Sequence, residues 1–281
     1  MRKLKDKTNI QIEVTNGCNL KCVNCSRFVG VNKKIFFMSL DEIERALQSL
    51  EGFKGGVGCM GGEPTLHPQF PEICKLFRKY IPEEHRGLWT NGYKWKEYEK
   101  EIRETFPIKH IVFNAHDFKY KGYHQPLLIA SKEIIKNEKL RMELINNCWI
   151  DKRWSASISP KGAFFCEVAC ALDHLFDLGG GWVVKKGWWK RVDLQDQVDK
   201  YCSLCSIAIP FDKEVYESHL QYISPGNLKL NSSIKNVELY DKKYFRSDYE
   251  KNIKNWNPGI FRDFYQVSPN KRLTKEEYNN L

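Results

Sequence analysis

Residues Asn9–Cys25 read NIQIEVTNGCNLKCVNC, a β-rich run followed at once by a cysteine-rich loop. The run Asn9–Thr15 predicts a strand, and Cys18, Cys22 and Cys25 follow it at CxxxCxxC spacing. Three soft thiolate ligands on one short loop suit one face of a [4Fe–4S] cluster and leave its fourth iron open. Zinc or a redox dithiol is the common alternative for close cysteine pairs, so the surrounding sequence has to decide.

The chain on both sides of this loop alternates β-rich runs with amphipathic stretches of helical period. Strands are predicted at Asn9–Thr15, Gly55–Cys59, Gly87–Thr90, His110–Phe113 and Met142–Asn146. Helices are predicted at Leu40–Leu50, Phe70–Tyr80, Tyr93–Thr105 and Leu127–Lys136, the first capped by Ser39 with Glu42 three residues later. This alternation predicts an α/β fold with a sheet of about five parallel strands and about four helices.

The pattern of residue types along the sequence changes near Cys148. Trp154–Ile158 and Ala163–Cys166 alternate like the strands of a hairpin around Pro160-Lys161-Gly162, and a triple-glycine loop and an aromatic-basic stretch follow. Beyond Pro210 the chain is polar and weakly periodic. We therefore expect a main domain over residues 1–147, a small cysteine-rich α+β appendage over 148–209, and an extension of unknown fold over 210–281.

Polar motifs follow four successive predicted strands. Gly61-Gly62-Glu63-Pro64-Thr65 follows the second strand, Thr90-Asn91-Gly92 the third, and Asn114-Ala-His116-Asp117 the fourth. In barrel-like α/β folds, ligand-handling residues gather at the carboxyl ends of the strands, so these motifs are expected to share one mouth with the cysteines. Thr90-Asn91-Gly92 is equally typical of a turn, and Asn114 of a loop cap.

The CxxxCxxC loop and the Gly-Gly-Glu-Pro motif together resemble the radical S-adenosylmethionine (SAM) superfamily. The resemblance implies a shortened partial (β/α) barrel in which Cys18, Cys22 and Cys25 hold a [4Fe–4S] cluster whose open iron chelates SAM. It implies cleavage of SAM to methionine and a 5′-deoxyadenosyl radical that abstracts hydrogen from a substrate. The residues implied in SAM binding are Gly61, Gly62, Glu63, Pro64, Asn91 and Asn114. Asn24 precedes Cys25 where the family often has an aromatic side chain, so packing on adenine from that position is not implied.

A second set of cysteines is similar to the twitch module, a shortened SPASM domain that carries one auxiliary [4Fe–4S] cluster. The spacing is Cys148-x17-Cys166, a gap, and then Cys202-x2-Cys205. Four thiolates would close the coordination of that cluster, leaving it to carry electrons. Cys170 could replace Cys148 in the ligand set, and a structural Cys₄ zinc site is the alternative. Among enzymes of this superfamily, the organisation is similar to that of 2-deoxy-scyllo-inosamine dehydrogenase.

The composition of the chain limits which class of protein and which cellular compartment are expected. The 281 residues contain ten cysteines, carry a formal net charge of +10, and include no apolar run of membrane-spanning length and no signal peptide. Ten cysteines without a secretion signal favour iron–sulfur or metal ligation in a reducing, cytoplasmic compartment. Trp182, Trp188 and Trp189 lie among basic residues, which suits either nucleic-acid stacking or an apolar plug over the second cluster.

The leading functional hypothesis is a radical SAM oxidoreductase that acts on a hydroxylated or phosphorylated small molecule such as a sugar, a cyclitol or a sugar nucleotide. The auxiliary cluster would accept an electron, and His116 or Asp117 would act as the base. An external donor such as flavodoxin or ferredoxin would reduce the first cluster, and no membrane partner is expected. Maturation of a ribosomally made peptide and RNA modification are the alternatives, and a non-catalytic nucleic-acid binder is a different class.

Overall fold

The computed structural model describes residues 3–114, 126–148, 155–209, 220–240 and 270–272, together with Phe211, Val215 and Ser218. Its main sheet has seven strands in the order β6-β5-β1-β2-β3-β4-β9. The strands are β1 (Asn9–Thr15), β2 (Gly56–Gly61), β3 (Arg86–Thr90), β4 (Ile111–Asn114), β5 (Ala156–Ser159), β6 (Gly162–Phe164) and β9 (Asn270–Arg272). Neighbours from β5 to β4 pair in parallel, whereas β6 and β9 are antiparallel at the two edges.

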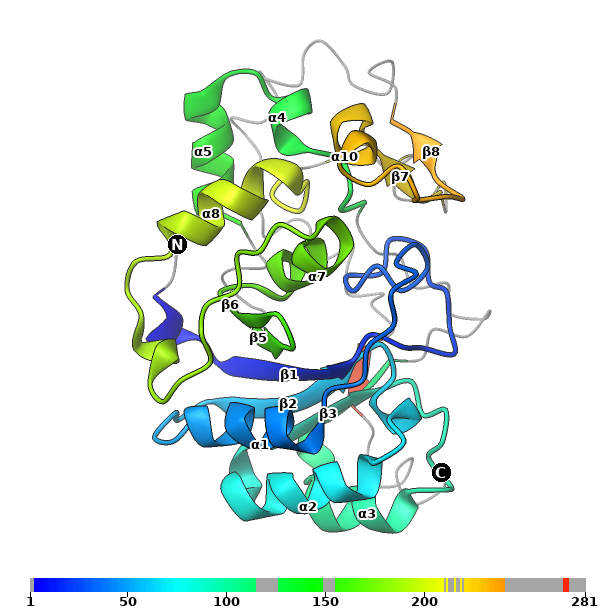
Figure 1. The fold of residues 1–281 in the computed structure, drawn as a ribbon, viewed down its shortest axis with the longest axis vertical. Helices are drawn as coiled ribbons and strands as arrows, with labels where there is room; N and C mark the ends of the chain where they lie inside the picture. Colours follow the sequence, from blue (N-terminus) through cyan, green and yellow to red (C-terminus); the bar gives the residue numbers. More distant parts are fainter. Residues whose placement is uncertain are drawn as a thin grey trace.

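Helices cover both faces of this sheet (Figure 1). One face carries α1 (Leu40–Ser49), α2 (Phe70–Tyr80) and α3 (Glu99–Thr105), and the other carries α7 (Glu167–Phe176) over β5 and β1. Beyond α7 lie the remaining elements, which are α4 (Ser131–Ile134), α5 (Glu138–Asn146), α8 (Gln195–Tyr201), α10 (Pro225–Leu230), β7 (Tyr222–Ile223) and β8 (Glu238–Leu239). No helix in the described part of the chain is long and apolar enough to cross a membrane.

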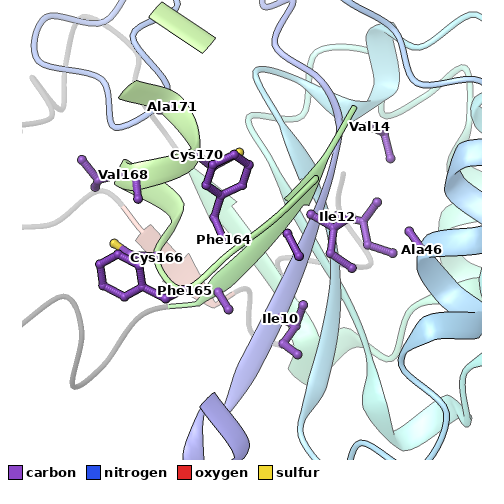
Figure 2. Close-up of a cluster of buried hydrophobic side chains, with 14 of the residues drawn as sticks. Ile10, Ile12, Val14, Ala46, Phe164, Phe165, Cys166, Val168, Cys170 and Ala171 are labelled. Atoms are coloured by element: carbon purple, nitrogen blue, oxygen red, sulfur yellow. The ribbon is translucent and has the colours of Figure 1, made fainter. Parts of the chain in front are cut away.

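Strand β1 is buried on both faces, and its two faces differ in chemistry. Ile10, Ile12 and Val14 point toward α1, where Ala46 packs near them (Figure 2). Gln11 and Glu13 alternate with them and so face the α7 side, where both are buried as well. The core between sheet and α1 is therefore apolar, whereas the layer between sheet and α7 contains buried polar groups.

Most predicted elements of the first half are confirmed, but the fifth strand is misplaced. Met142–Asn146 was expected to be a strand and instead forms the end of α5, whose first turn is capped by the Asn137 side chain accepting from the Leu140 N–H. That strand prediction is wrong, because a short apolar run fits either structure and the cap decides it. The fifth parallel strand is β5, which pairs Ile10 with Ala156 on the far side of β1. The predicted hairpin is thus present and extends the main sheet.

Two helices are shorter than predicted. The stretch Tyr93–Thr105 becomes helical only at Glu99, because the chain first turns after Gly92, a residue with a positive φ of 82°. In Leu127–Lys136, only Ser131–Ile134 is helical. Leu128 is held extended by a bridge to Ile223 and by the Ser224 N–H, which donates to its carbonyl at 3.1 Å. This partner lies almost a hundred residues away, so the local pattern could not reveal it.

The start of α1 offers a direct test of the local structure. Ser39 forms the predicted capping box, in which its side chain accepts from the Glu42 N–H and Glu42 accepts from the Ser39 N–H at 2.8 Å. We expect Ser39→Ala to lower the free energy of unfolding by about 1 kcal/mol. Urea denaturation with Lys54→Ala, an exposed change outside the helix, as the control checks this value. An unchanged midpoint would mean that the cap contributes nothing.

Candidate functional site

The cysteine loop leaves β1 at Thr15 and is held at its base by polar contacts. The Thr15 hydroxyl donates to the Phe36 carbonyl at 2.6 Å. The Asn16 side chain donates to the Lys34 carbonyl and accepts from the Phe36 N–H, both at 2.8 Å. Because both ends of the loop are held together, the loop presents its three cysteines in a defined shape.

Cys18, Cys22 and Cys25 are half-buried and lie near one another. Burial is the main cause that raises the pKa of Cys18 to about 11 and that of Cys22 to about 12, and the neighbouring thiols raise both further. No three Cys, His, Asp or Glu side chains among the described residues converge on one ion position. In a [4Fe–4S] cluster each thiolate binds a different iron, so such a cluster does not require that its ligands meet at one ion position.

Gly61 and Gly62 bring the end of β2 against the start of the cysteine loop. The Gly62 N–H donates to the Thr15 carbonyl and the Glu63 N–H donates to the Gly17 carbonyl, both at 2.8 Å. A Cβ on Gly61 would lie 2.0 Å from the Thr15 oxygen, and one on Gly62 would lie 2.2 Å from the Gly17 oxygen. Neither position can carry a side chain without moving the backbone, so these glycines fix the cysteine loop to β2.

The Glu63 carboxylate connects the ends of β2 and β3. One oxygen accepts from the Thr65 N–H at 3.2 Å and from the Thr65 and Thr90 hydroxyls, each at 2.7 Å. The other oxygen accepts from the Asn91 N–H at 2.7 Å. Glu63 is fully buried, and burial raises its pKa while these donors oppose the increase. Its carboxylate thus organises the protein backbone at this edge of the sheet.

Asn91 completes the contact between the motifs. Its side-chain amide donates to the Asn19 side chain at 2.9 Å and lies 3.7 Å from the Cys18 sulfur. The motifs that follow β1, β2 and β3 are therefore joined by hydrogen bonds at one edge of the sheet. Asn114 ends β4 at the same edge. The Asn114 side chain, His116 and Asp117 lie outside the described residues.

The later cysteines gather around a second position. A cavity of about 30 Å³ lies between α7, α8 and the end of α5, and its lining includes Cys148, Cys166, Cys202 and Cys205. Burial raises the pKa of Cys166 to about 12, and the nearby Cys148 raises it further. Cys148 and Cys166 also act on Cys205, whose pKa is raised mainly by burial. The structure thus brings together the four cysteines of the twitch-like pattern.

Cys170 lies on the opposite side of α7. Figure 2 shows its sulfur on the side of the sheet and the Cys166 sulfur on the other side. Cys170 interacts with Glu13 and Ser159, which belong to β1 and β5. Reaching the cavity would require α7 to rotate. Cys59 and Cys74 are fully buried on β2 and α2, and neither lines the cavity of the second cysteine group.

The tryptophans of the aromatic-basic stretch have other partners. Trp188 donates to the Ser49 hydroxyl at 3.2 Å, and Trp189 meets the Phe53 ring edge-on at 5.4 Å. Both therefore pack beside the end of α1, and neither lines the cavity of the second cysteine group. The interpretation of these two rings as a plug over that group is wrong. Trp182 donates to Asp196 at 2.7 Å and stacks with Arg191.

A segment that the sequence left unassigned touches both cysteine groups. The Asn24 N–H donates to the Gln221 side chain at 2.8 Å, and its own amide donates to the Leu220 carbonyl at 3.2 Å. Asn227, six residues after Gln221, donates to the carbonyls of Leu128 and Leu204, both at 2.8 Å. Leu204 lies between Cys202 and Cys205 in the sequence. Asn24 has a φ of 54°, which asparagine tolerates better than an aromatic residue.

The part of the chain that contains the cysteine loop is similar to one protein family. Residues 12–143 match the family model of the Radical SAM superfamily. This match spans β1 to α5 and includes the cysteine loop, the Gly-Gly-Glu motif and Asn91. This part of the chain is therefore similar to the Radical SAM superfamily, and the mostly parallel α/β sheet agrees with the partial barrel expected from that resemblance.

Particular relatives share only part of their length with this chain. A 7,8-dihydro-6-hydroxymethylpterin dimethyltransferase of Methanocaldococcus jannaschii is 31% identical over 144 residues, which is 49% of this chain and 26% of that protein. A probable GTP 3′,8-cyclase of Archaeoglobus fulgidus is 33% identical over 99 residues, which is 34% of this chain and 32% of that protein. The chain thus spans about a quarter to a third of the length of these curated relatives.

Among solved structures, the chain is similar to BtrN in complex with AdoMet and 2-DOIA. The TM-score is 0.42 at 17% sequence identity, and the superposition covers 85% of this chain and 97% of that one.

Proposed function

We propose that the protein is a radical SAM enzyme in which Cys18, Cys22 and Cys25 bind a [4Fe–4S] cluster. The observation that carries this proposal is the hydrogen-bonded contact between the cysteine loop, Glu63 and Asn91 within the part of the chain that is similar to the Radical SAM superfamily. A cluster bound there supplies the electron that cleaves SAM to methionine and a 5′-deoxyadenosyl radical. The protein's part is to hold three thiols together and to keep the ends of β1, β2 and β3 fixed beside them.

SAM binding is proposed at the same edge of the sheet. Gly62 and Asn91 are half-buried there, whereas Gly61, Glu63 and Pro64 are buried and support the backbone. The proposed contacts of Asn91 and Asn114 with SAM rest on their places at the ends of β3 and β4. An external electron donor such as flavodoxin or ferredoxin would approach the cysteine loop, where Lys21, Lys33 and Lys34 are exposed and suit an acidic surface.

We propose that the second cysteine group holds an auxiliary [4Fe–4S] cluster, which when bound accepts one electron from the substrate radical. Support comes from the four thiols that line one cavity, in an arrangement separate from Cys170. The resulting reaction is an oxidation of a hydroxylated or phosphorylated small molecule. His116 or Asp117 would supply the base on the grounds of position after β4. Peptide maturation and RNA modification are the competing substrate classes.

Replacing single cysteines distinguishes the ligand sets of the second group. We expect Cys148→Ala to lose about four irons per chain, because an auxiliary cluster needs all its thiolates. We expect Cys170→Ala to keep the wild-type iron content, since its sulfur faces Glu13 and Ser159. Iron and sulfide analysis of anaerobically reconstituted proteins measures both. The reverse result would place Cys170 in the ligand set, and zinc in place of iron would contradict the auxiliary cluster.

The substrate class can be tested through the hydrogen that the radical removes. Reconstituted, reduced protein would be incubated with SAM and a perdeuterated candidate: a sugar, a cyclitol, a sugar nucleotide, a peptide or an RNA. The true class transfers deuterium into 5′-deoxyadenosine, which mass spectrometry detects, and the proposal expects it from a small hydroxylated molecule. Transfer from peptide or RNA alone would contradict that expectation and leave SAM cleavage intact.

A further inference from the structure

A buried guanidinium lies between the two cysteine groups. Arg27 is 3% exposed and forms two ion pairs, from Nε to Glu13 at 3.4 Å and from Nη1 to Glu167 at 3.1 Å. Its Nη2 also donates to the Gln11 side chain and lies 3.1 Å from the Met60 sulfur. Both carboxylate partners are as deeply buried as Arg27. Burying three charged side chains costs free energy unless opposite charges lie in contact. The guanidinium and the two carboxylates must therefore keep this arrangement.

The members of this cluster are attached to both cysteine groups. Arg27 follows Cys25 by two residues, and Glu167 follows Cys166 directly at the first position of α7. A path from Cys25 to Cys166 can therefore follow covalent bonds except at a single noncovalent contact, the Arg27–Glu167 ion pair. Glu13 fixes the same guanidinium to β1, the strand that leads into the cysteine loop.

The charges of the pair lie close to both cysteine groups. Arg27 and Glu167 are in contact at 3.1 Å, and Arg27 follows Cys25 by two residues while Glu167 follows Cys166 directly. In the polar layer between β1 and α7, water does not screen these interactions, because the charged groups are not exposed. A charge at Glu167 is thus sensed in both groups.

We propose that Arg27 and Glu167 form one electrostatic link between the two cluster sites, positioning the cysteine loop against α7 and setting the reduction potentials of both clusters together. This inference rests on the proposed function, since it assumes a cluster at each site. Arg27 and Glu167 are positioning residues, because neither reaches solvent in this structure. A positive charge nearby favours the reduced, more negative cluster, and a carboxylate disfavours it.

The test measures reduction potentials in the full chain with both clusters reconstituted. We expect Glu167→Gln to raise the potentials of both clusters and Arg27→Gln to lower both. Each change should alter the one-electron reduction equilibrium by a factor of roughly ten, which is about 59 mV. The double variant should return toward wild type. EPR-monitored titration follows the clusters, with the signal that responds to SAM assigned to the first site.

Two further variants keep the result interpretable. Arg27→Lys keeps the charge but loses the planar fork, so potentials should stay near wild type even if stability falls. Glu51→Gln removes an exposed carboxylate that pairs with Lys186 at 2.7 Å, and it should leave both potentials unchanged. If Arg27→Gln does not fold, the rise expected for Glu167→Gln decides the matter.

Potentials that stay at the wild-type value in Glu167→Gln, or that move at one cluster alone, would overturn the link. Such a result leaves the proposed function standing, because both clusters are present in the same samples. A protein that assembles no cluster at Cys18, Cys22 and Cys25 contradicts the proposed function instead.

Discussion

A protein carrying Cys18→Ala is expected to form no 5′-deoxyadenosine above the level of a blank without protein. In the proposed site the three cysteines of the loop would each bind one iron, so loss of one would remove a ligand from the cluster that reduces SAM. The Cys18 sulfur also lies 3.7 Å from the side-chain amide of Asn91, which connects the cysteine loop to the end of β3. We expect the iron content to fall by about four per chain while iron at the second group is retained. Chromatographic detection of 5′-deoxyadenosine measures the product.

Cys59→Ala is the matched control for this experiment. Cys59 is fully buried on β2, only two residues before Gly61, and takes no part in the cysteine loop. Its replacement should leave both iron content and SAM cleavage close to wild type, with a modest loss of stability. SAM cleavage that persists in Cys18→Ala would contradict the assignment of the cysteine loop.

Glu63→Gln is expected to be among the most damaging single substitutions in the first half of the chain. The Glu63 carboxylate accepts four hydrogen bonds, and an amide would turn its NH₂ toward one set of these donors. Hydrogen bonds to a charged group contribute more than neutral ones, so we expect the free energy of unfolding to fall by about 2–4 kcal/mol. Urea denaturation of the apo-protein measures this loss without requiring a cluster.

The same substitution should weaken SAM binding, because the ends of β2 and β3 lose their common acceptor. Equilibrium dialysis with labelled SAM on reconstituted protein is the second measurement. Glu72→Gln, on the exposed side of α2, is the matched control and should change the free energy of unfolding by less than about 0.5 kcal/mol. Equal stabilities of the Glu63 and Glu72 variants would mean that the carboxylate does not organise the site.

Local sequence signals predicted the first half of the fold because its decisive features are local. Strand β1 and helix α2 have the predicted bounds, since the local periodicity of apolar residues fixes them within a few residues. The grouping of the motifs also follows from topology, because parallel neighbours end at one edge of the sheet. What the sequence did not reveal is that Gly61 and Gly62 press against the cysteine loop itself.

Several other features have non-local causes. Leu128 stays outside the helix because Ile223 of the C-terminal region forms a bridge with it. The hairpin at residues 156–164 joins the main sheet because β5 pairs in parallel with the edge of β1 that β2 does not occupy. Arg27 does not belong to a recognisable sequence motif. Gln11 and Glu13, however, are polar residues at inward positions of a buried strand, and buried polar side chains indicate that a polar partner exists. Such pairings depend on contacts between distant segments, which periodicity does not report.

The most direct test of the proposed function is SAM cleavage by the wild-type chain. Protein reconstituted anaerobically with iron and sulfide to about eight irons per chain, reduced with dithionite and given SAM, is predicted to release methionine and 5′-deoxyadenosine in equal amounts. A fully loaded protein that leaves SAM intact under these conditions would contradict the account.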